Sequence, residues 1–171
     1  MAETLKLQTS RFGELSVDPT TLIRMALPML GFESQTRFVL IQHKPDSPFL
    51  WLQSADDPDL AFILTQPQWF SMAYSITIPD AAVDALEITC AEDVEIYTLV
   101  TIPDDTPERM TTNLLGPVVI NKHNRKAAQI VLSDSAFGTK TPLLQPAKIG
   151  SEPATGTLQW LSQSAEPAAA V

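Results

Sequence analysis

The sequence is short of the residues that build most catalytic and metal sites. It has one cysteine, Cys90, so no internal disulfide can form, as is usual in a reducing compartment. Cys90 is expected to be an inert thiol in or near the core. The histidines, His43 and His123, have no second ligand at zinc-site spacing, and six scattered glycines form no phosphate loop. No metal and no cofactor are therefore expected.

Long apolar runs are also missing. No segment approaches the ~18 consecutive apolar residues that a membrane-spanning helix needs. Residues Met1 to Thr9 have no basic region followed by an apolar one, which a secretory signal would show. We expect a cytoplasmic protein without a membrane partner.

Positive charge is absent from Pro45 to Glu108, which holds thirteen acidic residues and no Lys, Arg or His. The sign reverses from Arg109 to Lys148, where Asp134 is the only carboxylate. With a net charge of −9, direct nucleic-acid binding is disfavoured. An acidic region raises the association rate with basic proteins. A surface that merely keeps the chain soluble is the alternative interpretation.

Short apolar segments, separated by Pro, Asp and Asn, recur at the ~8 to 12 residue spacing of all-β sandwiches and barrels. Val94 to Ile102 is largely apolar or mixed on both faces, which favours strands covered on both sides. The pattern predicts a mainly β fold in a single domain, with strands that suit a closed or partly closed barrel. The expected strands are Thr4–Thr9, Glu14–Val17, Arg37–Gln42, Phe49–Ser54, Ala61–Thr65, Ala73–Ile78, Val94–Ile102, Thr111–Leu115, Val118–Ile120 and Ala128–Leu132.

One or two short helices complete the expected domain. Asp18 can cap a turn that leads through Pro19 into Leu22–Met25, and Pro79–Leu86 has good helix formers behind Pro and Asp. Beyond Pro142 the composition shifts to Pro, Ala, Ser, Thr and Gly. We therefore expect a folded domain over residues 1–144 and a flexible Pro/Ala/Ser-rich tail over residues 145–171.

The expected strand Phe49–Ser54 carries two candidate interface anchors. Its alternation sends Phe49, Trp51 and Gln53 to one face. Aromatic residues are enriched at binding hot spots, which favours Phe49 and Trp51 as contacts. The alternative is that Trp51 belongs to the core or the barrel wall.

Short polar residues beside the strands are the other candidates. Asn113 and Asn121 bracket an apolar strand pair that is broken at Gly116-Pro117. The alternative is that both Asn residues only stabilise turns, since Asn accepts left-handed backbone conformations and bonds to nearby backbone groups. The carboxylate groups Asp56-Asp57 and Asp104-Asp105 lack the regularly spaced ligands and Gly of a calcium loop, so solvated turns are favoured over calcium or glycosidase sites.

Several blocks, in one order from about Leu7 to Leu143, resemble the FliW family of flagellar assembly factors. They are Phe12-Gly-Glu14, Gly31-Phe-Glu33, Arg37-Phe38, Trp51-Leu-Gln-Ser54, Val100-Thr-Ile-Pro103, Asn113-Leu and Pro117-Val-Val-Ile-Asn121. The chain departs from the family pattern at Met25–Phe32, which lacks the usual Phe-Pro-x-Gly-Leu-Pro-Gly-Phe order. Gly116 also replaces the more usual Ala.

The resemblance implies a small antiparallel β-barrel-like domain. It also implies a mainly monomeric, non-enzymatic factor that acts by stoichiometric protein binding. Such a factor binds the RNA-binding repressor CsrA at a site apart from its RNA surface, and thereby relieves repression of flagellin translation. It also binds newly made flagellin, as a chaperone does, which couples flagellin level to its translation. The expected contact residues are Phe49, Trp51, Gln53, Asp56, Asp57, Asp104, Asp105, Asn113 and Asn121.

Two other function classes stay open at this point. One is a small-ligand or carbohydrate-binding barrel that uses Trp51 and Trp69 as stacking platforms. The other is a hydrolase whose site assembles in space, with His43 or His123 beside a nucleophile.

Overall fold

The computed structural model describes residues 3–133 and 136–144, so the expected tail over 145–171 lies outside the described residues. The described chain is mainly β, with one α-helix, α1 (Asp80–Leu86), and short 3-10 turns. The strands are β1 (Leu5–Thr9), β2 (Gly13–Val17), β3 (Ile23–Leu27), β4 (Arg37–Ile41), β5 (Phe49–Ser54), β6 (Ala61–Thr65), β7 (Val94–Thr101), β8 (Thr111–Asn121), β9 (Lys126–Gln129) and β10 (Thr141–Pro142). No helix among these residues is long and apolar enough to cross a membrane.

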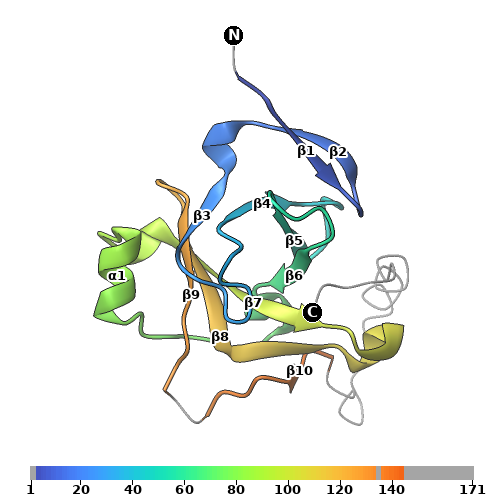
Figure 1. The fold of residues 1–171 in the computed structure, drawn as a ribbon. Helices are drawn as coiled ribbons and strands as arrows, with labels where there is room; N and C mark the ends of the chain where they lie inside the picture. The colour runs from blue at the N-terminus through green and yellow to red at the C-terminus, as the bar shows by residue number, and fades with distance from the viewer. Residues whose placement is uncertain (1–2, 134–135, 145–171) are drawn as a thin grey trace.

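Seven strands close into a barrel, which Figure 1 shows almost end-on. Their order is β8-β7-β6-β5-β4-β3-β9, and pairing of β9 with β8 completes the ring. Every pairing is antiparallel except β3 with β9, which is parallel. The expected antiparallel β-barrel-like fold is confirmed.

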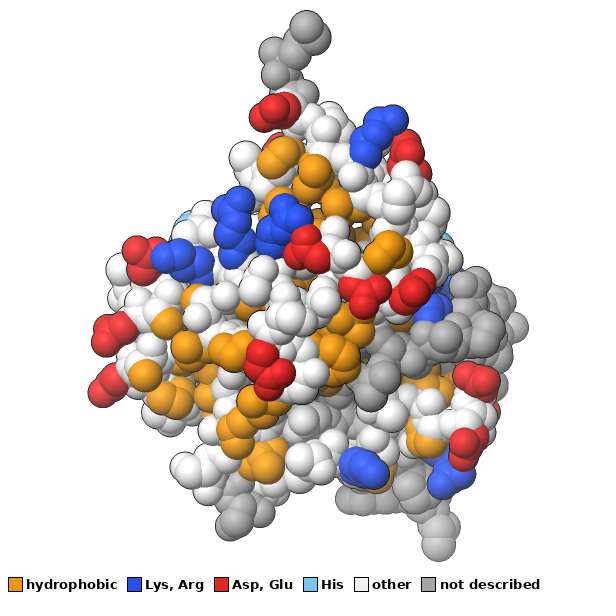
Figure 2. Space-filling view, viewed as in Figure 1, with side chains coloured by type: hydrophobic (Ala, Val, Ile, Leu, Met, Phe, Trp, Pro, Cys, Tyr) orange, Lys and Arg blue, Asp and Glu red, His pale blue; other side chains and the backbone are white. Residues whose placement is uncertain are grey.

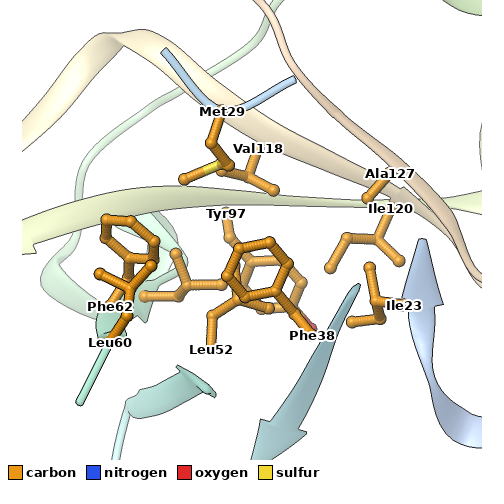
Figure 3. Packing of buried hydrophobic residues seen from close by; sticks show 11 residues of the cluster. Ile23, Met29, Phe38, Leu52, Leu60, Phe62, Tyr97, Val118, Ile120 and Ala127 are labelled. Carbon is orange, nitrogen blue, oxygen red and sulfur yellow. The ribbon is translucent and has the colours of Figure 1, made fainter. Parts of the chain in front are cut away.

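Inward-facing side chains fill the barrel. Phe38, Leu52, Phe62 and Tyr97 come from four different strands and meet in one buried cluster, seen in Figure 3. Met29, from the loop between β3 and β4, packs onto the same cluster. Each large side chain in this core stabilises the fold by about 2 to 5 kcal/mol against truncation to Ala.

The outward-facing apolar residues are covered as well. The β1–β2 hairpin lies over Val39, α1 lies over Val119 and Ala128, and residues around Met110 and Leu143 lie over Ile63 and Val100. This covering explains why the barrel strands are apolar on both faces, as the sequence predicts. It also shows why an open sheet would not suffice, since these outer faces would stay exposed.

Strand β8 pairs on one edge with two different strands. Its first part pairs with β10 through Thr111 and Thr112, and its last part pairs with β9 through residues 118–120. The expected break at Gly116-Pro117 falls between these parts but does not end the strand. The expectation of two separate strands is therefore wrong, because β7 runs along nearly the whole of β8 and holds it together.

The prediction of a helix after Asp18 is wrong beyond the first turn. Asp18 accepts a hydrogen bond from the Thr20 backbone N–H at 2.9 Å and caps a 3-10 turn, Pro19–Thr21, as its sequence indicates. The chain then enters β3, where Ile23 pairs with Phe38 of β4 and is fully buried. Pairing with two strands outweighs a weak local helix propensity. The helix expected near Pro79–Leu86 is confirmed as α1.

The strand expected over Ala73–Ile78 belongs to no sheet. Its alternation is nevertheless real, because Tyr74, Ile76 and Ile78 are half-buried and their neighbours are exposed. The Tyr74 hydroxyl donates to the Leu114 carbonyl at 2.5 Å, and burial raises the pKa of Tyr74 to about 12. The segment packs through side chains alone, and an alternating pattern does not distinguish that from sheet pairing.

Two smaller expectations need correction. Cys90 is exposed, because it stands at the start of the 3-10 turn Ala91–Asp93 on the surface. The last barrel strand, β9, covers Lys126–Gln129 instead of Ala128–Leu132, since the polar turn after Asn121 is short and pairing begins directly after it. β3 and β10 were not expected at all.

Candidate protein-binding surfaces

Trp51 lies on the outer wall of the barrel and is half-buried. Its ring and the Phe12 ring meet edge to face, with their centroids 5.8 Å apart, and the Arg11 guanidinium lies 4.2 Å from the Trp51 ring centroid. Arg11 and Phe12 belong to the turn between β1 and β2. Trp51 therefore packs this hairpin against the barrel and also leaves part of its ring on the surface.

Phe49 and Gln53, on the same face of β5, are buried. Phe49 packs in the outer cluster with Ile63, Val100 and Met110. The Gln53 side-chain N–H donates to the Leu60 carbonyl at 3.0 Å and the Ser54 carbonyl at 3.1 Å. Gln53 thus holds the base of the loop that joins β5 to β6, and its influence on a partner would pass through that loop.

The β5–β6 loop presents Asp56 and Asp57. Asp56 is exposed and forms a two-point ion pair with Arg37, whose Nε lies 3.3 Å from Oδ2. That pair raises the pKa of Arg37 further above its ordinary value, through the hydrogen bond first and the charge second. Asp57 is half-buried and accepts the Asp59 backbone N–H at 2.9 Å, a turn-forming bond.

Asp104 and Asp105 form the tip of the connection between β7 and β8. Both are exposed, and both have left-handed backbones, with φ of 50° and 53°. Asp tolerates this region better than most residues, but two in succession are uncommon. β5 and β7 run in the same direction because each is antiparallel to β6. The four carboxylates Asp56, Asp57, Asp104 and Asp105 therefore leave the barrel at one rim, which we call the acidic rim.

Asn113 and Asn121 both make internal hydrogen bonds. The Asn113 Oδ1 accepts the backbone N–H groups of Leu115 and Gly116 at 3.0 and 2.9 Å. A Cβ on Gly116 would lie 3.1 Å from the Asn113 side chain, so glycine lets the two approach. Asn121 is buried, and its Nδ2 donates to the carbonyl of Leu86, the last residue of α1, at 2.9 Å.

Two polar residues near α1 were not singled out from the sequence. Asp93 accepts three hydrogen bonds on one oxygen from Thr89 and Cys90, and these hold its pKa far below the ordinary value, the Thr89 hydroxyl contributing most. Asn124 donates to the Leu86 carbonyl at 3.0 Å beside Asn121. A polar residue three positions after a turn start is the signal that would have identified Asp93.

The geometry gives the hydrolase interpretation no support. His123 Nε2 lies 3.0 Å from the Asp93 carboxylate, on the surface, and Asp93 also raises the pKa of the Cys90 thiol through a hydrogen bond. A raised thiol pKa is the opposite of what a nucleophile needs. His43 faces the Phe12 ring. Among the described residues no group of three His, Cys, Asp or Glu is placed to hold a metal ion.

The carbohydrate-binding interpretation is not supported either. Trp69 is 66% exposed on the turn Pro67–Phe70, whereas Trp51 packs against Phe12 and Arg11. A cavity of about 280 Å³ is lined by Ser75, Ile76, Thr77, Pro79, Val131, Leu132, Ser133 and Phe137, and neither indole lines it. The two rings therefore do not share this pocket.

Comparison with known proteins places the whole barrel in one family. The FliW protein family model matches residues 6–143. The chain is 40% identical over 140 residues to a flagellar assembly factor FliW of Magnetococcus marinus, covering 82% of this chain and 85% of that relative. It is 37% identical over 141 residues to the one of Alkaliphilus metalliredigens, covering 81% and 86%. A crystal structure of the flagellar assembly factor FliW superposes with a TM-score of 0.75 at 32% identity, covering 82% of this chain and 98% of that one. The chain belongs to the FliW family.

Proposed function

We propose that this chain is a flagellar assembly factor that acts in the cytoplasm, as a monomer, by stoichiometric binding of two protein partners. One partner is a CsrA-type translational repressor, bound apart from its RNA surface, and the other is flagellin. The observation that carries the proposal is membership of the FliW family across residues 6–143. In this scheme flagellin competes for the factor, releases the repressor and lowers its own translation.

The acidic rim supports a basic partner such as an RNA-binding repressor. Asp104 and Asp105 are exposed, and the side chain of Asp104 lies no nearer than 3.9 Å to its closest cation, Arg109. Carboxylates so weakly paired remain available to a partner. They sit in a segment without positive charge, so the local field steers basic proteins toward the rim.

The remaining candidate contacts divide by exposure. We propose that Trp51 touches a partner with the exposed part of its ring, alongside Asp56 and Asp57. Phe49, Gln53, Asn113 and Asn121 are proposed to act mainly by holding this surface in shape, because their side chains bond or pack within the chain.

A binding titration against the CsrA of the same organism tests the proposal. We expect a saturable one-to-one complex that flagellin displaces, and that RNA bound to CsrA does not prevent. If neither protein bound at micromolar concentration, the proposed function would be wrong although the fold would stand.

The acidic rim can be tested with the double variant Asp104→Lys, Asp105→Lys. Association with CsrA should slow by about tenfold at low salt, with folding intact, because steering depends on local charge. The matched control is Asp46→Lys, Asp84→Lys, which makes the same charge change at exposed positions elsewhere. Equal slowing in both variants would remove the rim from the interface.

A further inference from the structure

Three cationic side chains form a row across neighbouring strands on the outside of the barrel. Arg24 of β3 is the direct register partner of Arg37 on β4 and of Lys126 on β9. Register partners point to the same face of a sheet. Their inner neighbours Ile23 and Ala127 are buried in the barrel core, so the row points outward. We call Arg37, Arg24 and Lys126 the basic row.

The cations at both ends of the row form ion pairs with carboxylates, whereas the cation at its centre does not. Asp56 pairs with Arg37, and Glu87 pairs with Lys126 at 2.7 Å. Arg24 is exposed and has no ion pair or hydrogen bond from its side chain to any residue that the structure describes. In Figure 2, Lys and Arg side chains gather on the upper left of the surface, with Asp or Glu side chains beside them.

This arrangement places like charges side by side on the outer face of the barrel. Like charges that face each other across a strand pair repel, and Arg24 faces one on each side. Arg125 adds a further positive charge close by, since its guanidinium bonds the Thr21 carbonyl at 3.2 Å just before β3. This repulsion predicts that a neutral residue at position 24 leaves the barrel at least as stable. An unpaired Arg at the centre of such a row is therefore better explained by an external anion.

The flanking charges restrict the kind of anion. Nucleic acid would meet Asp56 and Glu87 at the ends of the row and a protein of net charge −9 around it. A short protein segment with a few carboxylates meets less repulsion. Neighbouring strands lie about 4.8 Å apart, close to the ~5 to 6 Å between residues one turn apart on a helix.

We propose that the basic row is a docking surface for an acidic helical segment of a partner protein, with Arg24 making the central ion pair. The partner's outer carboxylates compete with Asp56 and Glu87, whose pairs are solvent-exposed and so exchange at little cost. The surface lies on the β4-β3-β9 wall, whereas the acidic rim attracts cations. The molecule thus has two charged surfaces of opposite sign, and they meet at Asp56.

The test uses the full-length ¹⁵N-labelled chain and a synthetic helical peptide with Glu at three positions four residues apart. The control peptide carries Gln at the same positions. Saturable shifts of the β3, β4 and β9 amide resonances are expected with the Glu peptide only, and added salt should weaken them. Shifts that are equal with both peptides, or that lie elsewhere, would overturn the proposal.

Arg24→Gln should weaken binding of the Glu peptide by about two- to fivefold, the range of one exposed ion pair. Its melting temperature should equal or exceed that of the parent chain. Lys140→Gln, the matched loss of one exposed cation away from the row, should leave peptide binding unchanged. A lowered melting temperature in Arg24→Gln would mean that Arg24 stabilises the fold, against the proposal. A single-stranded RNA that shifted the same resonances more strongly than the peptide would also overturn it.

Discussion

Asn121 and Asp104 are both short polar residues beside long strands, and their surroundings differ completely. Asn121 is 2% exposed, donates to the end of α1, and accepts the His123 backbone N–H at 2.9 Å. The side chain of Asp104 is 87% exposed, and its nearest cation is 3.9 Å away. The Asn121 side chain makes hydrogen bonds within the fold, whereas the Asp104 side chain is open to solvent.

The comparison extends to the regions around these residues. Near α1, the side chains of Asn121, Asn124 and Asp93 bond backbone groups at turns and at the helix end. At Asp104-Asp105, the turn is held by backbone bonds such as Thr106 N–H to Pro103 carbonyl at 2.8 Å, and both Asp residues are exposed. Side chains at Asp104 and Asp105 can therefore be replaced with less effect on the fold than those near α1.

The largest effect on folding is expected for Asn121→Ala. Loss of its buried hydrogen bonds should lower the free energy of unfolding by about 1 to 3 kcal/mol, measured by urea denaturation. Asn124→Ala removes a more exposed bond to the same Leu86 carbonyl and should cost clearly less. Equal losses would mean that burial does not distinguish the two amides.

A smaller, pH-dependent effect is expected for Asp93→Asn. The pKa of Asp93 is lowered in the folded chain from 3.8, so its stabilisation is present above that pH and is lost as the pH falls below it. The variant should be less stable than the parent at neutral pH, and the difference should shrink on acidification below about pH 4. Denaturation curves across this range measure it. A difference that stayed constant with pH would contradict the assignment, and exposed Asp84→Asn serves as control.

The smallest effect on folding is expected for Asp104→Gly combined with Asp105→Gly. Glycine accepts a left-handed backbone without strain but loses more entropy on folding, so stability should change by less than about 0.5 kcal/mol. Binding of a basic partner should weaken all the same, because two exposed carboxylates are gone. A large loss of stability would show that these carboxylates belong to the fold, as Asn121 does.

Much of the barrel could be predicted from residue patterns. β5 and β6 begin and end where the alternation and flanking turns indicate, and the apolar character of both faces of β7 indicated a closed, covered sheet. β3 was missed because Ile23–Leu27 follows a capping signal and has little strand signal of its own. Its identity comes from pairing with β4 and β9, which lie far apart in the sequence.

The candidate site was less accessible to sequence reasoning. Phe49 and Trp51 alternate alike, yet the residues around Met110 and Leu143 bury one and leave the other partly open. The basic row could not be predicted from the sequence, because residues 24, 37 and 126 become neighbours only through strand register. Charge counting found the acidic segment, since its carboxylates lie in one unbroken stretch of chain that has no positive charge.

The sequence by itself determined that this chain forms a covered β-barrel, carries an acidic middle segment and resembles FliW proteins, because these properties reside in local pattern and composition. Only the tertiary structure decided which polar side chains form hydrogen bonds inside the molecule and which remain exposed on its surface. That division depends on what each side chain meets in the closed barrel, whose ring is completed by the pairing of β9 with both β3 and β8. Burial and register are properties of the closed ring, so no single segment contains them.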